Sequence, residues 1–384
     1  MNKIPLAVPV IGDVEKKCIS EALSSNHIAI GPHVKLFEDQ IANFLGAKNA
    51  IALNSGTAAL QLMIEASDLT KGDVILVPSL TFGATVNAII HAGCEPCFID
   101  IDASDLCIAP TSIERFISER CHIADGRLLE KETGKSVKAI MIVHMYGNVC
   151  NMALIARVAK KYGLEIFEDG TEALGAKFDN VPLGSNSRFF ALSFNGNKII
   201  TSGGGGMLLT NDSTVADKVR QLAAQGKSIH DPADIDFVGH NFRMPNLNAA
   251  FAYGQSLVLA NHLERKQIIA KEYNARLGKL EGLSMITSAP DTWGVFWMVV
   301  FRVDPKKIGF DALRLGQFLA DAGIETRPVW KPLDTMLPFK KFLKGELKFC
   351  YDVYQKCICL PCSVNLEIDE INYICEKIEN LITE

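Results

Sequence analysis

The sequence predicts an α/β protein: a large domain with a mostly parallel, helix-covered sheet of seven strands, followed by a smaller α+β domain. Two observations support this fold class. Short apolar runs alternate with segments of helical periodicity as far as residue 210. A long helical pattern then leads into a second group of strands and helices. Since 384 residues are enough for two domains, we place the domains at residues 1–250 and 251–384.

The elements of the predicted sheet follow one another along the first part of the chain. Two helices, at 11–24 and 33–44, have apolar residues at helical spacing. The strands are short apolar runs at 50–53, 74–77, 97–99, 139–143, 164–167, 189–192 and 207–209. Helices at 54–67, 85–91 and 152–162 lie between strands. A polar, charged segment at 124–136 interrupts this alternation, and we expect an exposed insertion there.

The smaller predicted domain begins with a helical pattern from 245 to 280, which we expect to bridge the two domains. A strand at 298–303, a helix at 310–322, a strand at 357–360 and a terminal helix at 368–382 complete it.

Charge and composition argue against several classes of protein. With 39 basic and 44 acidic residues, the net charge of -5 provides no basic surface for nucleic acid or an anionic membrane. No apolar run approaches the ~20 residues that span a bilayer. The N-terminus, with two prolines and a very short apolar stretch, is a poor signal peptide. We therefore expect a cytoplasmic protein that binds neither nucleic acid nor membrane.

The eleven cysteines are interpreted as reduced thiols, most of them in core positions. Two groupings could hold a metal, namely Cys94-x-x-Cys97, and Cys357-x-Cys359-x-x-Cys362 with Cys350 upstream. Neither has a matching pair at zinc-ribbon spacing, so we expect no metal.

Four segments at predicted strand ends carry side chains suited to one ligand. The stretch Ser55-Gly56-Thr57-Ala58 opens a helix, where free N–H groups bind anions. Phe82 follows a strand and offers a flat face. Asp169 ends another strand, at the edge where open sheets bind ligands. Lys198 ends a turn after an apolar strand, beside Gly203–Gly206, and an apolar setting favours its unprotonated amine.

Each feature alone has a structural explanation. The hydroxyls are ordinary helix caps, the aromatic ring is a core residue, the aspartate is a cap, and the lysine is a surface residue. Together, however, an anion cradle, an aromatic face, a carboxylate and an amine match the phosphate, ring, ring nitrogen and aldehyde of pyridoxal phosphate. Nicotinamide and P-loop sites are disfavoured, because neither glycine motif is present in its proper context.

Across essentially its whole length, the chain resembles the DegT/DnrJ/EryC1/StrS family of pyridoxal phosphate-dependent sugar aminotransferases. The matching stretches are Leu53-Asn54-Ser55-Gly56-Thr57-Ala58-Ala59-Leu60, Pro78-Ser79-Leu80-Thr81-Phe82, Glu168-Asp169-Gly170-Thr171-Glu172-Ala173-Leu174-Gly175, Ser193-Phe194-Asn195-Gly196-Asn197-Lys198 and Asn241-Phe242-Arg243-Met244-Pro245-Asn246. The resemblance implies a type I aminotransferase fold, a pyridoxal phosphate cofactor with a pyridoxamine (PMP) form in its cycle, and a homodimer.

The resemblance also implies a role for each matching residue. Lys198 would bond to the cofactor aldehyde and move the proton, and Asp169 would keep the ring nitrogen protonated. Phe82 would stack on the ring, and Glu172 would lie near its 3-oxygen with a shared proton. Arg243 would reach the phosphate of the neighbouring subunit, so that each site is shared. The other cofactor-binding positions are Gly56, Thr57, Ala58, Ser193 and Asn195.

The implied reaction moves an amino group from L-glutamate, which leaves as 2-oxoglutarate, to C4 of a nucleotide-linked 4-keto-6-deoxy sugar. The polar insertion and the Asn-Gly-Asn-Lys turn are most similar to the subgroup that uses UDP-4-keto-6-deoxy-N-acetylglucosamine in bacillosamine and legionaminic acid synthesis. Trp330 and Lys331 are the expected substrate contacts. Relatives that dehydrate their sugar carry histidine in place of the lysine, so Lys198 argues against that reaction.

Two alternatives stay open at this point. One is a perosamine-type enzyme acting on a GDP-linked sugar that lacks the N-acetyl group. The other is a non-catalytic regulator or binding protein on the same fold, which would not need Lys198, Asp169 and the phosphate cradle together. One departure from the family concerns the substrate: Val295 stands where many relatives have asparagine, which removes an amide from the expected site.

Overall fold

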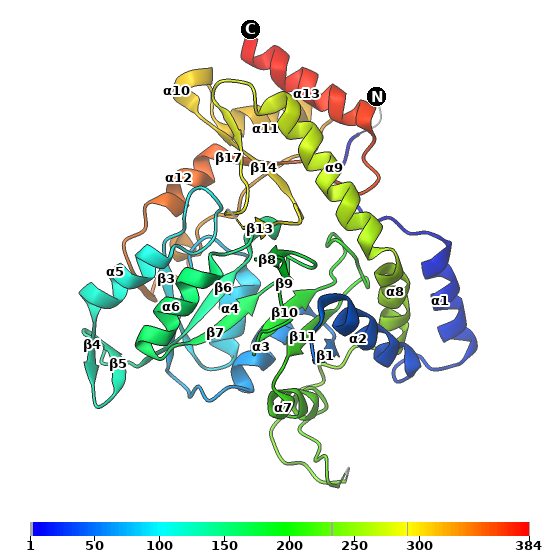
Figure 1. Cartoon of the computed structure of the whole chain (residues 1–384), viewed down its shortest axis with the longest axis vertical. Coiled ribbons are helices and arrows are strands. Elements are labelled where there is room, and N and C mark those ends of the chain that lie inside the picture. Colours follow the sequence, from blue (N-terminus) through cyan, green and yellow to red (C-terminus); the bar gives the residue numbers. More distant parts are fainter. Residues whose placement is uncertain (1–2, 232, 290, 384) are drawn as a thin grey trace.

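The computed structural model describes residues 3–231, 233–289 and 291–383. A large sheet occupies the centre of the molecule, and a smaller sheet lies in the part that carries both chain ends (Figure 1). The large sheet has the order β1-β11-β10-β7-β6-β2-β3-β16. Its strands are β1 (Asn49–Leu53), β2 (Val74–Pro78), β3 (Glu95–Ile99), β6 (Val137–Val143), β7 (Glu165–Asp169), β10 (Phe190–Ser193), β11 (Gly206–Thr210) and β16 (Leu343–Lys344).

All seven predicted strands are present in this sheet, and the mostly parallel arrangement is confirmed. Only β11 runs antiparallel to its neighbours, β1 and β10, whereas the other pairs are parallel. The eighth strand, β16, was not predicted. Its two residues are too few to show a periodic pattern, and it joins the sheet edge from the C-terminal part of the chain.

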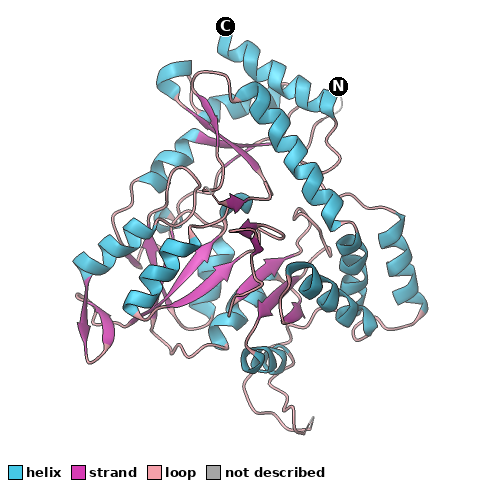
Figure 2. Cartoon of the chain, in the orientation of Figure 1, coloured by secondary structure: helices cyan, strands magenta, loops and turns pink. Residues whose placement is uncertain are grey.

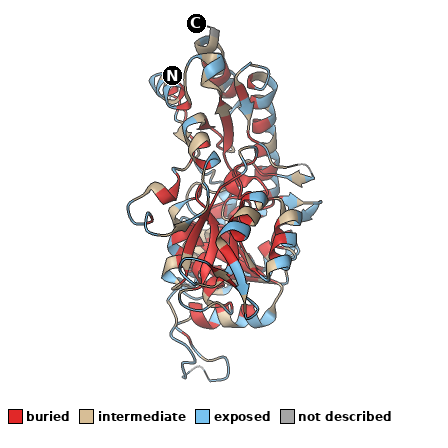
Figure 3. Ribbon diagram, turned by 90° about the vertical axis from the view of Figure 1, so that its left-hand side faces the viewer, coloured by how far each residue is buried: buried red, intermediate tan, exposed pale blue. Residues whose placement is uncertain are grey.

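Two helix layers cover the sheet, one on each face (Figure 2). Val74 and Leu76 pack with α2, α5 and α6, whereas Ile75 and Val77 pack with α3, α4 and α7. Successive side chains of a strand point to opposite faces, so burial on both faces explains why the strands are continuous apolar runs. Figure 3 shows the buried residues concentrated along this sheet. The helices are α2 (Pro32–Leu45), α3 (Gly56–Glu65), α4 (Gly83–His91), α5 (Pro110–Arg120), α6 (Met152–Tyr162) and α7 (Ser213–Ala223).

The smaller sheet is antiparallel, with the order β12-β14-β17-β15. Its strands are β12 (Leu283–Met285), β14 (Val299–Val303), β15 (Arg327–Pro328) and β17 (Cys357–Leu360). The helices of the C-terminal part are α9 (Leu259–Leu277), α10 (Pro305–Ile308), α11 (Ala312–Asp321), α12 (Phe349–Lys356) and α13 (Ile368–Thr383). The chain also forms two short 3-10 turns, η1 (Met145–Gly147) and η2 (Leu333–Thr335), and a three-stranded ribbon of β8 (Lys177–Phe178), β9 (Val181–Pro182) and β13 (Thr292–Trp293).

One prediction about a connecting segment was wrong, and another was confirmed only in part. The pattern at 245–280 is two helices, α8 (Asn246–Leu257) and α9, because the backbone leaves helical geometry at Val258, with φ -108° and ψ 5°. The segment at 124–136 is not simply exposed. It is part of a hairpin of β4 (Cys121–Ala124) and β5 (Arg127–Glu130), in which Glu130 is fully buried and accepts hydrogen bonds from Thr133.

The division of the chain near residue 250 remains a prediction. Residues near the N-terminus contact segments on the other side of this boundary. Near the N-terminus, Ile4 forms a β-bridge with Ile324, and the carbonyl of Leu6 accepts the N–H of Cys362 at 2.8 Å. Helix α1 (Asp13–Ser24) packs on α8, with Cys18 and Ala250 in one small apolar cluster. No helix in the described part of the chain is long and apolar enough to cross a membrane.

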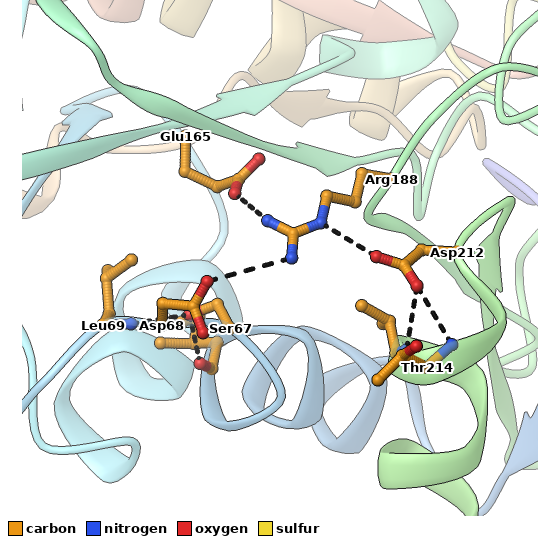
Figure 4. A network of polar contacts seen from close by, with 9 residues as sticks. Ser67, Asp68, Leu69, Glu165, Arg188, Asp212 and Thr214 are labelled. Atoms are coloured by element: carbon orange, nitrogen blue, oxygen red, sulfur yellow. Dashed lines mark hydrogen bonds and ion pairs between the residues drawn. The ribbon is translucent and has the colours of Figure 1, made fainter.

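A network of ion pairs around Arg188 connects neighbouring segments at the end of the sheet where β7 and β10 begin (Figure 4). Its guanidinium pairs with Glu165, the first residue of β7, and lies 3.4 Å from Asp212, which caps α7. A third carboxylate, Asp68, lies 4.0 Å away. The site described next lies at the other ends of these strands.

Candidate active site

A cavity of about 340 Å³ lies where the carboxyl ends of the parallel strands meet the C-terminal part of the chain. Asp169 is the last residue of β7, Ser193 is the last residue of β10, and Ser55 follows β1. From the C-terminal part come Trp297, Arg327 and Trp330. Of the predicted site residues, the cavity lining includes Gly56, Thr57, Phe82, Asp169, Glu172, Ser193, Asn195, Lys198 and Trp330.

Lys198 ends the turn that follows β10, and its N–H donates to the carbonyl of Asn195 at 3.0 Å. The turn is fastened by Trp297, whose indole N–H donates to the carbonyl of Asn197 at 2.7 Å. The Nζ atom lies 3.9 Å from the centroid of the same indole ring, and only 14% of the lysine side chain is exposed. Burial lowers the pKa of Lys198, and the nearby carboxylate of Glu172 opposes this fall. The amine is therefore held still and loses its proton more easily than a surface lysine.

Glu172 is the buried carboxyl closest to this amine. Its Oε1 lies 3.7 Å from Lys198 Nζ, and its Oε2 accepts the N–H of Tyr146 at 2.7 Å. Burial raises the pKa of Glu172, while the charge of Lys198 and the hydrogen bond from Tyr146 oppose the rise. Such a carboxyl takes up a proton more readily than an exposed one, which fits the predicted sharing of a proton with a neighbouring oxygen.

Asp169 forms the acceptor at the end of β7. It is buried, and its Oδ2 accepts the hydroxyl of Thr85 at 2.8 Å, while Oδ1 accepts the N–H of Thr171 at 3.1 Å. The hydroxyl of Thr85 in turn lies 2.9 Å from that of Thr81. These donors fix the carboxylate plane, so that its remaining lone pairs can face a ring N–H in the cavity.

The anion cradle depends on two close backbone approaches at the start of α3. A Cβ on Gly56 would lie 2.8 Å from Cβ of Ser193, and one on Gly206 would lie 2.2 Å from the carbonyl oxygen of Ser55. Glycine is therefore required at both positions. Ser55 caps the helix by accepting the N–H of Ala58 at 3.0 Å. The N–H groups of Gly56 and Thr57 precede the helical hydrogen bonds and suit a phosphate.

Phe82 lines the cavity next to Trp330. It is 55% exposed, and its ring lies 5.0 Å from that of Trp330, so core packing does not explain it. An aromatic side chain left exposed beside a cavity can cover a flat ligand.

Comparison with known proteins decides the family. A model of the DegT/DnrJ/EryC1/StrS aminotransferase family matches residues 9–379. The chain belongs to this family. EpsN of Bacillus subtilis (strain 168), which is named as a pyridoxal phosphate-dependent aminotransferase, is 34% identical over 99% of this chain and 96% of its own. The GDP-perosamine synthase of Escherichia coli O157:H7 is 32% identical over 100% of both chains.

The fold is that of solved members of the family. An aminotransferase of the DegT/DnrJ/EryC1/StrS family from Brucella abortus aligns over 97% of this chain and 96% of its own, with a TM-score of 0.88 and 25% identity. The type I fold is therefore confirmed. The chain is therefore a pyridoxal phosphate-dependent enzyme that aminates a nucleotide sugar.

The cavity fits this cofactor. Gly56, Thr57 and Ser193 would hold its phosphate, Asp169 its ring nitrogen, Phe82 one face of its ring, and Lys198 its aldehyde. When bound, the group supplies an aldehyde that exchanges amines and a ring that accepts the electrons of the adjacent carbon. The protein would then position the reactants and handle the proton: Lys198 would deliver it or accept it at the reacting carbon, and Asp169 would hold positive charge on the ring.

Three predicted residues are not among those that line the cavity. Ala58 is buried and its N–H already serves the Ser55 cap. Lys331 is exposed, because the chain turns away at Pro332 into η2. Arg243 is exposed and lines a separate cavity of about 690 Å³ with Gly31.

Sequence reasoning missed three residues that shape the site, namely Thr85, Trp297 as the anchor of the lysine turn, and Arg327. Thr85 looks like an ordinary residue of the first turn of α4, and the tryptophan and arginine come from segments that fold back over more than 90 residues. Val295, in place of the asparagine common in the family, is fully buried and donates its N–H to Gly147, so it does not contact the cavity. All eleven cysteines are buried free thiols, and the described residues contain no cluster of three or more His, Cys, Asp or Glu suited to a metal.

Proposed function

We propose that the chain transfers an amino group from L-glutamate to C4 of a nucleotide-linked 4-keto-6-deoxy sugar, and that Lys198 is the proton carrier. The observation that supports this most is the fixed amine between Trp297 and Glu172, which faces the same cavity as Asp169 and the start of α3. A regulator that only binds its ligand has no need for a lysine whose pKa is lowered.

We further propose UDP-4-keto-6-deoxy-N-acetylglucosamine as the sugar. Asn195 and Asn197 line the cavity, and their amide groups can pair with the polar N-acetyl group. If such a partner becomes shielded from water when the sugar binds, it discriminates against a sugar that lacks the group, by about 1–3 kcal/mol. The second candidate is GDP-4-keto-6-deoxymannose, which is favoured by the identity to the perosamine synthase.

Steady-state kinetics with both sugars and L-glutamate test this choice, with product mass read by mass spectrometry. We expect kcat/KM for the UDP sugar to be at least ~tenfold higher. Asn197→Asp should narrow the ratio, because a carboxylate cannot donate to the acetyl oxygen. Equal rates, or a preference for the GDP sugar, would assign the chain to the perosamine-type branch.

We also propose that the protein is a cytoplasmic homodimer with shared active sites. Arg243 is exposed and does not line its own subunit's active-site cavity, which leaves it free to reach a neighbour. Eleven free thiols suit a reducing compartment. Lys198→Ala and Arg243→Ala homodimers should both be impaired. In a mixed dimer both lesions fall on one site, so co-refolding should restore part of the activity. Heterodimers that form without such recovery would contradict sharing.

A further inference from the structure

Three buried N–H groups on the C-terminal wall of the cavity lack an acceptor. Among the described residues, Nε and Nη2 of Arg327 and Nε1 of Trp330 are shielded from solvent and make no hydrogen bond. Both residues line the cavity. A buried donor without an acceptor costs about 1–3 kcal/mol, and more when it is charged. These groups are therefore suited to an acceptor that arrives with a ligand.

Arg327 is also a cavity cation that forms no ion pair with a described carboxylate. Lys198 has Glu172 at 3.7 Å, but none of the ion pairs within 4.0 Å in the described part of the chain involves Arg327. The guanidinium instead lies between two indole rings, 4.0 Å from the centroid of Trp330 and 5.9 Å from that of Trp297. Stacking of this kind orients the planar fork, which matches a carboxylate or phosphate through two parallel hydrogen bonds.

The position of Arg327 relative to Lys198 favours one of these anions. Both cations lie near the Trp297 ring, with Lys198 Nζ 3.9 Å and Arg327 Cζ 5.9 Å from its centroid. The pKa of Lys198 is lowered by burial and, in addition, by the charge of Arg327. In an amino acid, the α-carboxylate is bonded to the carbon that carries the reacting amine. In a nucleotide sugar, the pyrophosphate is attached to C1, across the ring from the reacting C4. A fork close to the lysine therefore suits the carboxylate.

We propose that Arg327, assisted by Nε1 of Trp330, binds the α-carboxylate of the amino donor and of the 2-oxo acid that leaves. A small rotation of the guanidinium would bring its unpaired edge to the carboxylate oxygens. The inference rests on the proposed transamination and defines its donor half. A simple amine is a poor donor because it lacks the group that pairs with the fork. The sugar presents neutral groups next to C4, so its half of the reaction depends on Arg327 much less.

The test separates the two half-reactions. Arg327→Gln, Arg327→Lys and wild type are loaded with pyridoxal phosphate, together with Arg314→Gln, which alters an exposed arginine on α11. Calorimetric titration with 2-oxoglutarate measures binding without turnover, because neither the pyridoxal form nor 2-oxoglutarate brings an amino group to transfer. Single-turnover absorbance measures amine uptake from L-glutamate by this form, and amine delivery to the keto sugar by the pyridoxamine form.

We expect Arg327→Gln to weaken 2-oxoglutarate binding by roughly 10- to 100-fold and to slow amine uptake at low glutamate equally. Amine delivery to the sugar should stay within about threefold of wild type. The preference for L-glutamate over 4-aminobutyrate should collapse in the same variant, since the second amine has no α-carboxylate. Arg314→Gln should match wild type in every assay.

Unchanged 2-oxoglutarate affinity in a folded, cofactor-loaded Arg327→Gln protein would overturn the inference. So would a loss confined to the sugar half-reaction, because the fork would then serve the nucleotide. If the glutamine variant does not fold, Arg327→Lys decides: it keeps the charge but not the fork, and at least about fivefold weaker binding is expected. Rejection of every keto sugar by wild type would instead refute the proposed function. The titration with 2-oxoglutarate would still test the role of Arg327, because it does not involve the sugar.

Discussion

Replacement of Trp297 by phenylalanine should make the turn that carries Lys198 more mobile and should also destabilise the folded protein. The indole is 2% exposed, donates to the carbonyl of Asn197 at 2.7 Å and lies under Lys198 Nζ. Phenylalanine keeps a ring but loses the N–H and part of the volume. The unpaired carbonyl costs about 1 kcal/mol at this half-buried position, and the space left by the smaller ring adds about 1–2 kcal/mol.

We therefore expect the free energy of unfolding of the Trp297→Phe apoprotein to fall by about 2–3 kcal/mol in urea denaturation. A more mobile Lys198 should also lower kcat about tenfold at saturating substrates. The matched control is Trp293→Phe, whose indole is 37% exposed and whose replacement should change stability by less than about 0.5 kcal/mol. If both variants unfold at the same urea concentration and turn over equally fast, Trp297 does not hold the lysine turn.

Three further substitutions probe other parts of the structure. Glu172→Gln removes the carboxylate that raises the pKa of Lys198. The lysine amine is free in the pyridoxamine form, so the acid limb of the pH profile of kcat/KM for the keto sugar should move to lower pH; a shift to higher pH would contradict this pairing. Arg188→Met should lower the free energy of unfolding by no more than about 1 kcal/mol and leave kcat unchanged, because the network lies at the far ends of β7 and β10; a measurable loss of kcat would be inconsistent with that placement. Asp334→Asn disrupts a buried carboxylate that accepts from Ser79 Oγ at 2.7 Å and from two other donors, and should cost about 3 kcal/mol in urea denaturation; a cost below about 1 kcal/mol would show that the network is not needed.

The sequence was sufficient for those parts of the site that belong to strand ends. Buried strands are continuous apolar runs, so the polar residue that follows each run, such as Asp169 or Ser55, can be placed at the sheet edge. Lys198 could be singled out because a lysine follows an apolar strand and precedes a run of glycines. The prediction failed where no local pattern exists.

The C-terminal wall of the cavity is the clearest case of such a failure. Arg327 and Trp297 reach the site through contacts between segments far apart in the chain. No local sequence pattern around either residue predicts these contacts. Lys331, four residues from Arg327, was chosen instead because it lies in the same stretch, but its side chain is exposed. Strand β16 could not be predicted either, because two residues cannot show a periodic pattern. It is a strand because it pairs with β3.

The central claim, that Lys198 carries the cofactor, is tested most directly by reduction with borohydride followed by peptide mass spectrometry. The protein should be yellow as purified, and the reduced adduct should be found on the peptide containing Lys198 and be absent from Lys198→Ala. Lys271→Ala, which alters an exposed lysine, should keep the adduct. Lys266 is the other strongly buried lysine near the cavity, but its amine donates to the carbonyls of Trp297 and Cys362. An adduct on Lys266, or one that survives in Lys198→Ala, would contradict the assignment.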